Sequence, residues 1–175
     1  MQRLTTYRNL QVFLVLMAII GMSFALFFLQ RYMGFSPCPL CIFQRIGLMV
    51  MGGFALIAAL FNPKSKVIKL VLWLGSLAGI LWATGVAIRH VWLQHLPADQ
   101  VPSCGPGLDY WLDTLPMQQV LKEVFAGSGE CAAIDWTFMG LSIPEQSLIL
   151  FSVLIIAHLM ILWRILRPLP LQGSL

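Results

Sequence analysis

Residues 10–29 read LQVFLVLMAIIGMSFALFFL and contain no charged side chain. A helix needs about 20 predominantly apolar residues to cross roughly 30 Å of hydrocarbon, so this run predicts a membrane-spanning helix. Three further apolar runs follow it along the chain, and we expect transmembrane helices over residues 10–30, 41–61, 69–89 and 144–164. The expected fold is an all-α integral membrane protein, a four-transmembrane-helix bundle that forms a single membrane domain over residues 1–175.

The composition favours a membrane protein as well. Hydrophobic residues make up 59% of the chain and charged residues only 10%, against about 25% charged residues in a soluble domain. The first apolar run could also be a signal peptide, with Arg3 and Arg8 as its basic region. Apolar residues continue through Leu29, however, which favours a retained helix over a cleaved leader.

Charged residues are divided between the two ends of the expected bundle. All seven acidic residues lie within 99–145. The basic residues at the opposite helix ends are Arg3, Arg8, Lys64, Lys66, Lys69, Arg164 and Arg167. Since Lys and Arg near helix ends mark the cytoplasm, we expect both termini to be cytoplasmic and the loops 31–40 and 90–143 to face outward. The net charge of +4 follows from this asymmetry and does not indicate nucleic-acid binding.

The long outer loop is expected to carry a short amphipathic helix. Pro116 suits a first helical position, and the apolar residues of 117–125 recur at the spacing of one helix face. In a loop too small for a core of its own, such a helix is expected to lie on the membrane surface. Packing against its own loop is the alternative.

All four cysteines fall on the outer side in this topology. In a bacterium that side is the oxidising periplasm, where disulfides persist. Four cysteines allow three connectivities. The pairing Cys38–Cys41 with Cys104–Cys131 needs the least rearrangement, but the sequence alone leaves the choice open. Proline and glycine around Cys104 predict a mobile, exposed segment there, and Gly127-Ser128-Gly129 predicts a flexible stretch that leads to Cys131.

The CxxC pair and a nearby cation suggest redox chemistry. Thiol–disulfide exchange needs a thiolate, and Cys38 and Cys41 open a helix whose N-terminal dipole favours negative charge. Arg45 follows Cys41 at i+4 on the same helix face, so its guanidinium can stabilise a thiolate or another anion. The alternative for Arg45 is snorkelling to lipid headgroups. His90, at the outer end of the third helix, lies at similar depth and could donate a hydrogen bond to a carbonyl-bearing ligand, or be an ordinary interfacial histidine.

Metal binding is the less favoured interpretation of the cysteines. Four cysteines could hold zinc, but structural zinc sites usually combine two closely spaced pairs. Here Cys104 and Cys131 lie far apart in the sequence. Ile42 follows the CxxC pair, so the CxxCH signature of haem attachment is absent. We expect no metal ion as a resident group.

Taken together, these residues resemble the DsbB family, bacterial inner-membrane proteins that reoxidise the periplasmic disulfide donor DsbA by passing electrons to quinone. The resemblance extends over nearly the whole chain. Its motifs are Cys38 and the run Cys41-Ile42-Phe43-Gln44-Arg45, His90, Cys104, Gly127-Ser128-Gly129-Glu130-Cys131, and Trp136-Thr137-Phe138-Met139-Gly140-Leu141 before Pro144. Two positions depart from the pattern: Gln44 stands where some members carry Glu, and Gln146 where we expect Trp.

The resemblance implies a catalytic role for each cysteine. Cys104–Cys131 is implied to be the disulfide that oxidises DsbA, with Cys104 as the site of the mixed disulfide. Cys131 is then implied to attack Cys38 of a Cys38–Cys41 disulfide. This leaves Cys41 as the thiolate that donates electrons to the quinone, either ubiquinone or menaquinone.

The resemblance also implies a binding role for two further residues: Arg45 would stabilise the thiolate and the reduced quinone, and His90 would line the quinone site. The protein is thus expected to be a quinone-dependent protein-dithiol oxidoreductase of the bacterial inner membrane. Three alternatives remain open: a paralogue that serves another periplasmic thiol partner, a vitamin-K-epoxide-reductase-like enzyme, and a membrane scaffold with two inert disulfides.

Overall fold

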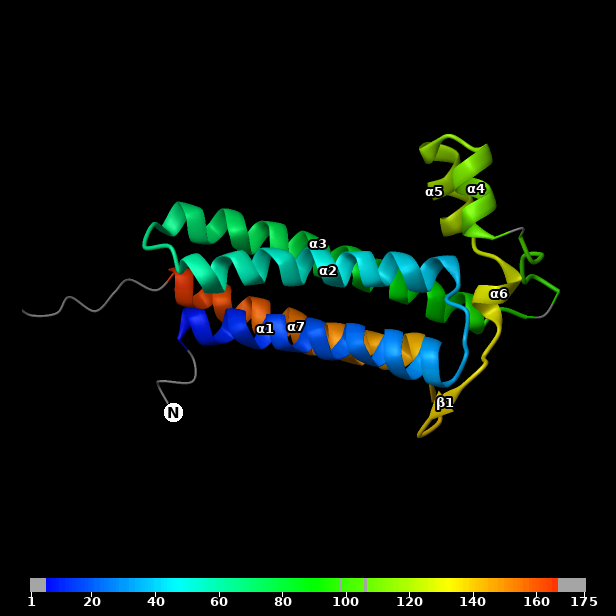
Figure 1. The fold of residues 1–175 in the computed structure, drawn as a ribbon, viewed down its shortest axis with the longest axis horizontal. Coiled ribbons are helices and arrows are strands. Elements are labelled where there is room, and N and C mark those ends of the chain that lie inside the picture. The colour runs from blue at the N-terminus through cyan, green and yellow to red at the C-terminus, as the bar shows by residue number, and fades with distance from the viewer. Residues whose placement is uncertain (1–5, 98, 106, 167–175) are drawn as a thin grey trace, which may run out of the picture.

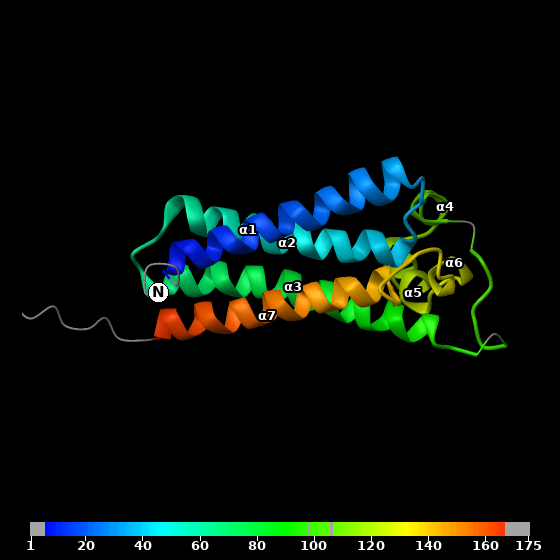
Figure 2. The ribbon, with the colours of Figure 1, turned by 90° about the horizontal axis from the view of Figure 1, so that it is seen from below.

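The computed structural model describes residues 6–97, 99–105 and 107–166, and it is mostly helical. Within these residues, four helical segments are long and apolar enough to cross a membrane. They lie side by side in both views (Figures 1 and 2), which confirms the predicted four-helix membrane bundle. The segments are α1 (Tyr7–Ser23) with its π-helical continuation η1 (Phe24–Tyr32), α2 (Pro39–Phe61), α3 (Lys66–Gln94) and α7 (Ile143–Leu166). Arg3 and Arg167 lie outside the described residues.

Glycines allow α2 and α3 to pack closely. A Cβ atom on Gly47 would lie 2.7 Å from the carbonyl oxygen of Gly79, and one on Gly79 would lie 2.6 Å from the backbone nitrogen of Met51. Only hydrogen fits at these positions, so the two backbones touch. Such small-residue contacts are a usual means of helix association in lipid. The fully buried Leu14 of α1 and Leu154 of α7 extend the core to the other two helices.

A buried polar network ties three helices together within this core. Ser76 of α3 lies 2.9 Å from Nε2 of His158 on α7, and its hydroxyl is 3.1 Å from the carbonyl oxygen of Met51 on α2. His158 Nδ1 lies 2.8 Å from the carbonyl oxygen of Leu154, and Trp73 donates to the His158 carbonyl over 3.0 Å. Each polar group thus has a protein partner, as a lipid environment requires.

The third helix is longer than predicted. We expected it to end at residue 89, but it continues to Gln94. Leu93 is fully buried, which stabilises the additional turn, and Pro97 is the first following residue that cannot continue a helix. His90 therefore lies inside the helix, about one turn before its end.

The remaining elements gather at one end of the bundle, where α2 begins, and α1 begins at the other end (Figure 1). They are α4 (Leu108–Thr114), α5 (Met117–Ala126), α6 (Gly129–Ala132) and the antiparallel hairpin of β1 (Thr137–Phe138) and β2 (Leu141–Ser142). We call this the cysteine end of the bundle.

The amphipathic helix α5 packs against protein. Val120 and Val124 on its apolar face are buried in one cluster with Leu40 of α2, Leu93 of α3 and Trp111 of α4. The expectation that this face lies on the membrane surface is therefore wrong, because side chains of the other helices already cover it. Docking of α5 fixes the chain that leads to Cys131.

Candidate redox site

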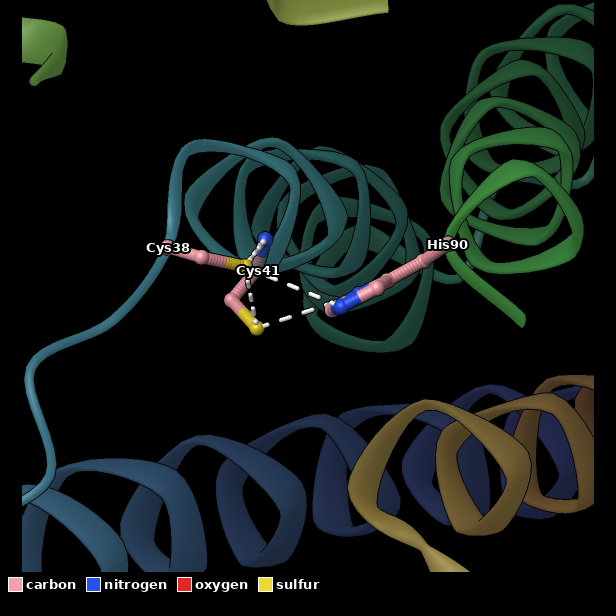
Figure 3. A group of neighbouring side chains, drawn as sticks. All are labelled: Cys38, Cys41 and His90. Carbon is pink, nitrogen blue, oxygen red and sulfur yellow. Dashed lines mark hydrogen bonds between the residues drawn. The ribbon is translucent and has the colours of Figure 1, made fainter. Parts of the chain in front are cut away.

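The CxxC pair forms the first turn of α2 (Figure 3). Cys38 is the extended N-cap residue, and its sulfur accepts a hydrogen bond from the backbone nitrogen of Cys41 at 3.4 Å. Pro39 then occupies the first turn, where its missing N–H costs nothing. The Cys38 thiol donates to the Cys41 sulfur over 3.2 Å. All four cysteines are free thiols in this structure, so the pairings Cys38–Cys41 and Cys104–Cys131 stay predictions.

His90 reaches from α3 toward both sulfurs, as Figure 3 shows. Its Nε2 atom lies 3.8 Å from Cys38 Sγ, and its Nδ1 atom lies 4.0 Å from Cys41 Sγ. The side chain is only 3% exposed. The structure therefore brings together the CxxC pair and the histidine that the sequence placed at the same depth.

Gln44 is a site residue that the sequence analysis noted only as a departure from a family pattern. It is buried, and its Nε2 lies 3.1 Å from Nδ1 of His90. This contact orients the imidazole ring between the two cysteine sulfurs. Its position three residues after Cys41, on the same helix face, was the available signal.

Arg45 is held by a second unpredicted residue. Its Nη1 donates to Oε1 of Gln30 on η1 over 2.8 Å, and the side chain is half-buried. A cation inside a membrane helix is costly without a polar partner. Arg45 therefore has a partner within the protein, which argues against simple snorkelling to the headgroups.

A cavity of about 560 Å³ opens at the cysteine end. We call it the mouth cavity, and five of the six residues named from the sequence line it: Cys38, Cys41, Arg45, His90 and Cys104. Residues from the helix starts, from the loop before α2 and from the segment after α6 complete its wall. A thiol of another protein that enters this space meets Cys104 and the CxxC pair together.

A second cavity, of about 290 Å³, lies between α1, α2 and α7. We call it the inter-helix cavity, and its wall is mainly apolar, with Phe24 and Leu150 among its residues. Cys41 and Arg45 line this cavity as well as the mouth cavity. His90 lines the mouth cavity but is not among the described residues around the inter-helix cavity, so its contact with quinone stays a prediction.

Cys131 is buried in the short helix α6, where we expected a flexible stretch. It is 1% exposed and belongs to the cluster that packs α5 against α2 and α3. Its sulfur lies 3.7 Å from the Ser128 hydroxyl. The interaction with the Cys38 side chain and, next, burial raise the pKa of the Cys131 thiol above its usual range. Cys131 therefore lies next to Cys38 as a neutral thiol.

Cys104 is exposed, as the sequence predicted. A Cβ atom on Gly129 would lie 2.9 Å from the Cys104 sulfur and 3.0 Å from the carbonyl oxygen of Pro102. The Cys104 segment therefore lies directly on the backbone at the start of α6. This contact keeps the exposed thiol close to the helix that carries Cys131.

Arg89 anchors α5 to the transmembrane bundle. Its Nε and Nη2 donate to the carbonyl oxygens of Phe125 and Ala126 over 2.9 and 3.0 Å. The guanidinium also lies over the Trp92 ring, 4.2 Å from its centroid, and the Phe125 ring meets Trp82 edge-on at 5.5 Å. A cation at a helix C-terminus is favourable for the helix dipole, so Arg89 fixes the end of α5 from which the chain runs to Cys131.

Gln94 ties the segment after Cys131 to the bundle. It donates to the carbonyl oxygen of Ala133 at 3.3 Å and accepts from the Ser142 hydroxyl at 2.7 Å. The additional turn of α3 thus bridges the chain after α6 and the start of α7. Anchors before and after Cys131 hold it against the CxxC pair.

Comparison with known proteins identifies the family of this chain. The model of the family described as "Disulfide bond formation protein DsbB" matches residues 7–161. The chain belongs to the DsbB family. Members named "Disulfide bond formation protein B" include those of Psychrobacter cryohalolentis, 88% identical over 168 residues, and Psychrobacter arcticus, 87% identical over 168 residues; each alignment covers 96% of both chains. That of Acinetobacter baylyi is 57% identical over 165 residues, or 94% of both chains.

DsbB membership confirms the resemblance read from the sequence. It establishes a disulfide-forming membrane oxidoreductase, and with the four long apolar helices it points to a multi-pass protein of the inner membrane. It also implies a periplasmic thiol partner.

Proposed function

We propose that this DsbB-family protein reoxidises a periplasmic DsbA-like thiol oxidase and passes the electrons to a membrane quinone, either ubiquinone or menaquinone. In this proposal the cysteine end faces the periplasm and both termini are cytoplasmic. The observation that carries the proposal is that Cys41 and Arg45 line both cavities. One cavity also exposes Cys104 to a protein partner, and the other offers an apolar space between transmembrane helices.

The thiol steps start from Cys104–Cys131 as a disulfide. A thiolate of the partner attacks the exposed Cys104 sulfur, which breaks the disulfide and releases Cys131. The partner's second thiol then displaces Cys104, so the partner leaves oxidised and Cys104 and Cys131 carry the two electrons as thiols. The exposure of Cys104 and the burial of Cys131 favour this order of attack.

The CxxC pair then takes up the electrons. Cys131 as a thiolate attacks Cys38 of a Cys38–Cys41 disulfide, and Cys41 leaves as a thiolate near Arg45. Cys104 attacks Cys131, which restores their disulfide and leaves Cys38 as a thiol. The proximity of Cys131 to Cys38 supports this step, because a Cys38–Cys41 disulfide would lie within reach of the Cys131 sulfur.

The inter-helix cavity suits a quinone as the electron-accepting substrate. Its volume of about 290 Å³ is near the lower limit of ligand pockets, which are typically apolar with a few polar groups. Arg45, Gln44 and Gln146 supply such groups. A quinone takes up the two electrons and two protons that the Cys38–Cys41 dithiol loses when its disulfide forms again. The Arg45 guanidinium stabilises the negative charge that develops beside Cys41.

An unusual dithiol is needed because DsbA is itself a strong oxidant. DsbA has a potential near about −120 mV, whereas structural disulfides lie below about −300 mV, and 30 mV corresponds to roughly 1.4 kcal/mol. Oxidation of DsbA by an ordinary structural disulfide would therefore be unfavourable by roughly 8 kcal/mol of free energy. Stabilising the Cys41 thiolate by Arg45 and by the N-terminus of α2 raises the potential in the required direction.

The test is anaerobic mixing of the purified protein, a reduced DsbA-like oxidase and a soluble quinone, with quinone reduction followed by absorbance. We expect catalytic turnover that disappears in Cys38→Ala, Cys41→Ala, Cys104→Ala and Cys131→Ala. The exposed His95 gives a matched control, since His95→Ala should leave turnover intact. Persisting turnover in Cys41→Ala would remove that cysteine as the electron donor.

A variant of Arg45 distinguishes the quinone step from the thiol-exchange step. Arg45→Ala should slow quinone reduction more than mixed-disulfide formation at Cys104, which is measured by trapping the partner with its second cysteine replaced. Equal loss in both measurements would instead assign Arg45 a purely structural role. Turnover with a different thiol partner but none with DsbA would favour the dedicated paralogue.

A further inference from the structure

We propose that the reduced Cys38–Cys41 pair, together with His90, forms a binding site for a thiophilic divalent cation such as Zn²⁺. The consequence for turnover rests on the function proposed above, but the site itself does not. One ligand atom from each of the three residues lies within 4.8 Å of the others. Figure 3 shows all three side chains pointing into one space.

The separations match those of a tetrahedral zinc site. Zn–S bonds of about 2.3 Å and Zn–N bonds of about 2.0–2.1 Å place neighbouring ligand atoms roughly 3.5–3.8 Å apart. The Cys38 and Cys41 sulfurs lie 3.2 Å apart, and His90 Nε2 lies 3.8 Å from the Cys38 sulfur. All three ligand atoms lie within 4.8 Å of one another, so shifts of about 1 Å bring them to the separations of a zinc site.

The surroundings of His90 suit a metal ligand. Histidine ligands usually donate the N–H of their second ring nitrogen to an acceptor, which fixes the ring. The Gln44 side-chain amide lies 3.1 Å from Nδ1 of His90. Turning this amide over presents its oxygen to Nδ1–H and leaves Nε2 free to bind the cation.

The mouth cavity supplies access and the fourth coordination position. All three ligands line it, so water can complete a tetrahedral shell, as in zinc sites with three protein ligands. The carboxylates of Glu130 and Asp135 line the same cavity and favour the approach of a cation. The guanidinium of Arg45 opposes it, but two bound thiolates neutralise the charge of a divalent ion.

Binding is gated by the redox state of the pair. Zn²⁺ displaces one proton from each thiol and forms two Zn–S bonds, and no electron moves. A Cys38–Cys41 disulfide offers no thiolate, so only the reduced pair binds the ion. The bound ion holds both sulfurs in the reduced state, and the enzyme should therefore stop until the ion is removed.

Cobalt(II) is a visible probe for this site. We expect the purified full-length protein, reduced and freed of reductant under anaerobic conditions, to bind one Co²⁺ with sulfur-to-cobalt charge-transfer absorption that Zn²⁺ abolishes. Cys38→Ser and Cys41→Ser should lose this absorption, and the matched Cys104→Ser should keep it. His90→Ala should weaken binding by more than the ~10–100-fold that loss of an outer partner costs, whereas His95→Ala should not.

Equal Co²⁺ binding by the oxidised protein, or an unchanged affinity in both Cys38→Ser and His90→Ala, would overturn the site. These measurements use neither quinone nor a thiol partner, so failure of the proposed function leaves them valid. A separate turnover assay tests the inhibition: Zn²⁺ should stop turnover, and a chelator should restore it. Full turnover of the Zn²⁺-saturated protein would overturn the inhibitory role even where cobalt binds as expected.

Discussion

Arg45 of α2 donates its hydrogen bond to Gln30 of η1 over 2.8 Å, so the cation beside the CxxC pair is oriented by a different transmembrane segment. Gln30 is not charged and adds no counter-ion. The guanidinium therefore keeps its full positive charge for an anion in either cavity. This division makes Gln30 a positioning residue, and it can be tested without removing the charge.

Gln30→Leu should slow quinone reduction and leave mixed-disulfide formation at Cys104 unchanged. A hydrogen bond to a charged group contributes about 1.5–3 kcal/mol, which corresponds to roughly 10- to 150-fold in rate when it is wholly expressed in the transition state. Gln30→Glu, which keeps the acceptor oxygen, serves as the comparison for orientation. The role assigned to Gln30 fails where Gln30→Leu reduces quinone at the wild-type rate.

Arg89→Gln should loosen α5 without changing the CxxC pair. The variant loses the charged donor to the carbonyl oxygens of Phe125 and Ala126. We expect faster hydrogen exchange of the α5 amides in residues 117–126 and slower electron transfer from Cys131 to Cys38. A hydrogen bond to a charged group contributes about 1.5–3 kcal/mol, and the loss should be only part of this because the contact with Ala126 is exposed. Arg89→Lys retains the charge and should fall between. Wild-type exchange in α5 of Arg89→Gln would show that the apolar cluster alone holds the helix.

Gly79→Ala should destabilise the bundle, whereas Gly53→Ala should not. A methyl group at Gly79 would lie 2.6 Å from the backbone of Met51, and one at Gly53 meets nothing within 4 Å. Overpacking of this kind costs about 1–3 kcal/mol, while alanine in a helix is favoured over glycine by about 1 kcal/mol. Thermal unfolding in detergent measures both. Equal melting temperatures for the two variants would contradict the close approach of α2 and α3.

The alkylation rate of Cys131 in the reduced protein should keep rising with pH beyond the pKa of about 8.5 of a free thiol. The raised pKa of the Cys131 thiol keeps it neutral through that range, and only the thiolate reacts. Mass spectrometry of a maleimide time course measures the rate at each pH. The exposed Cys104 in the same sample is the control for the reactivity of the maleimide. Cys38→Ser should shift the Cys131 profile to lower pH.

The raised pKa of the Cys131 thiol also makes the stability of the reduced protein depend on pH. A thiol whose pKa is raised by folding stabilises the protein below its unfolded pKa, and this contribution is lost as the pH rises above that value. The reduced protein should therefore lose stability above about pH 8.5, and Cys131→Ser should lose less. A stability that increases over this range in the wild type alone would reverse the assignment.

The sequence predicted the transmembrane helices and the CxxC site because both depend on local patterns. Apolar runs long enough to span a bilayer specify the helices, and the i, i+4 relation specifies the shared face of Cys41 and Arg45. Burial of Cys131 was not predictable in the same way. It depends on Leu40, Leu93 and Val124, which come from three separate elements and meet only in the folded protein.

The partners of the site residues were missed for a related reason. Gln30 precedes Arg45 by fifteen positions and lies in a π-helical segment whose register the sequence does not reveal. Gln44 is next to Arg45 in the sequence, but its contact with His90 requires knowledge of how α2 crosses α3. Interactions between helices thus had to come from the structure, whereas interactions within one helix could be predicted.

The length of α2 has a consequence for the lipid that surrounds the protein. Its 23 residues span about 34 Å, a few ångströms more than the roughly 30 Å of bilayer hydrocarbon. Cys41 lies in the first turn, within the small excess of helix length. A thicker bilayer should draw its sulfur into the hydrocarbon, and a thinner one should bring Arg45 to the headgroups. The length of the lipid acyl chains therefore determines how far the Cys41 sulfur is exposed to water. Lipid composition can thus change the reactivity of Cys41 without any change in the residues of the site.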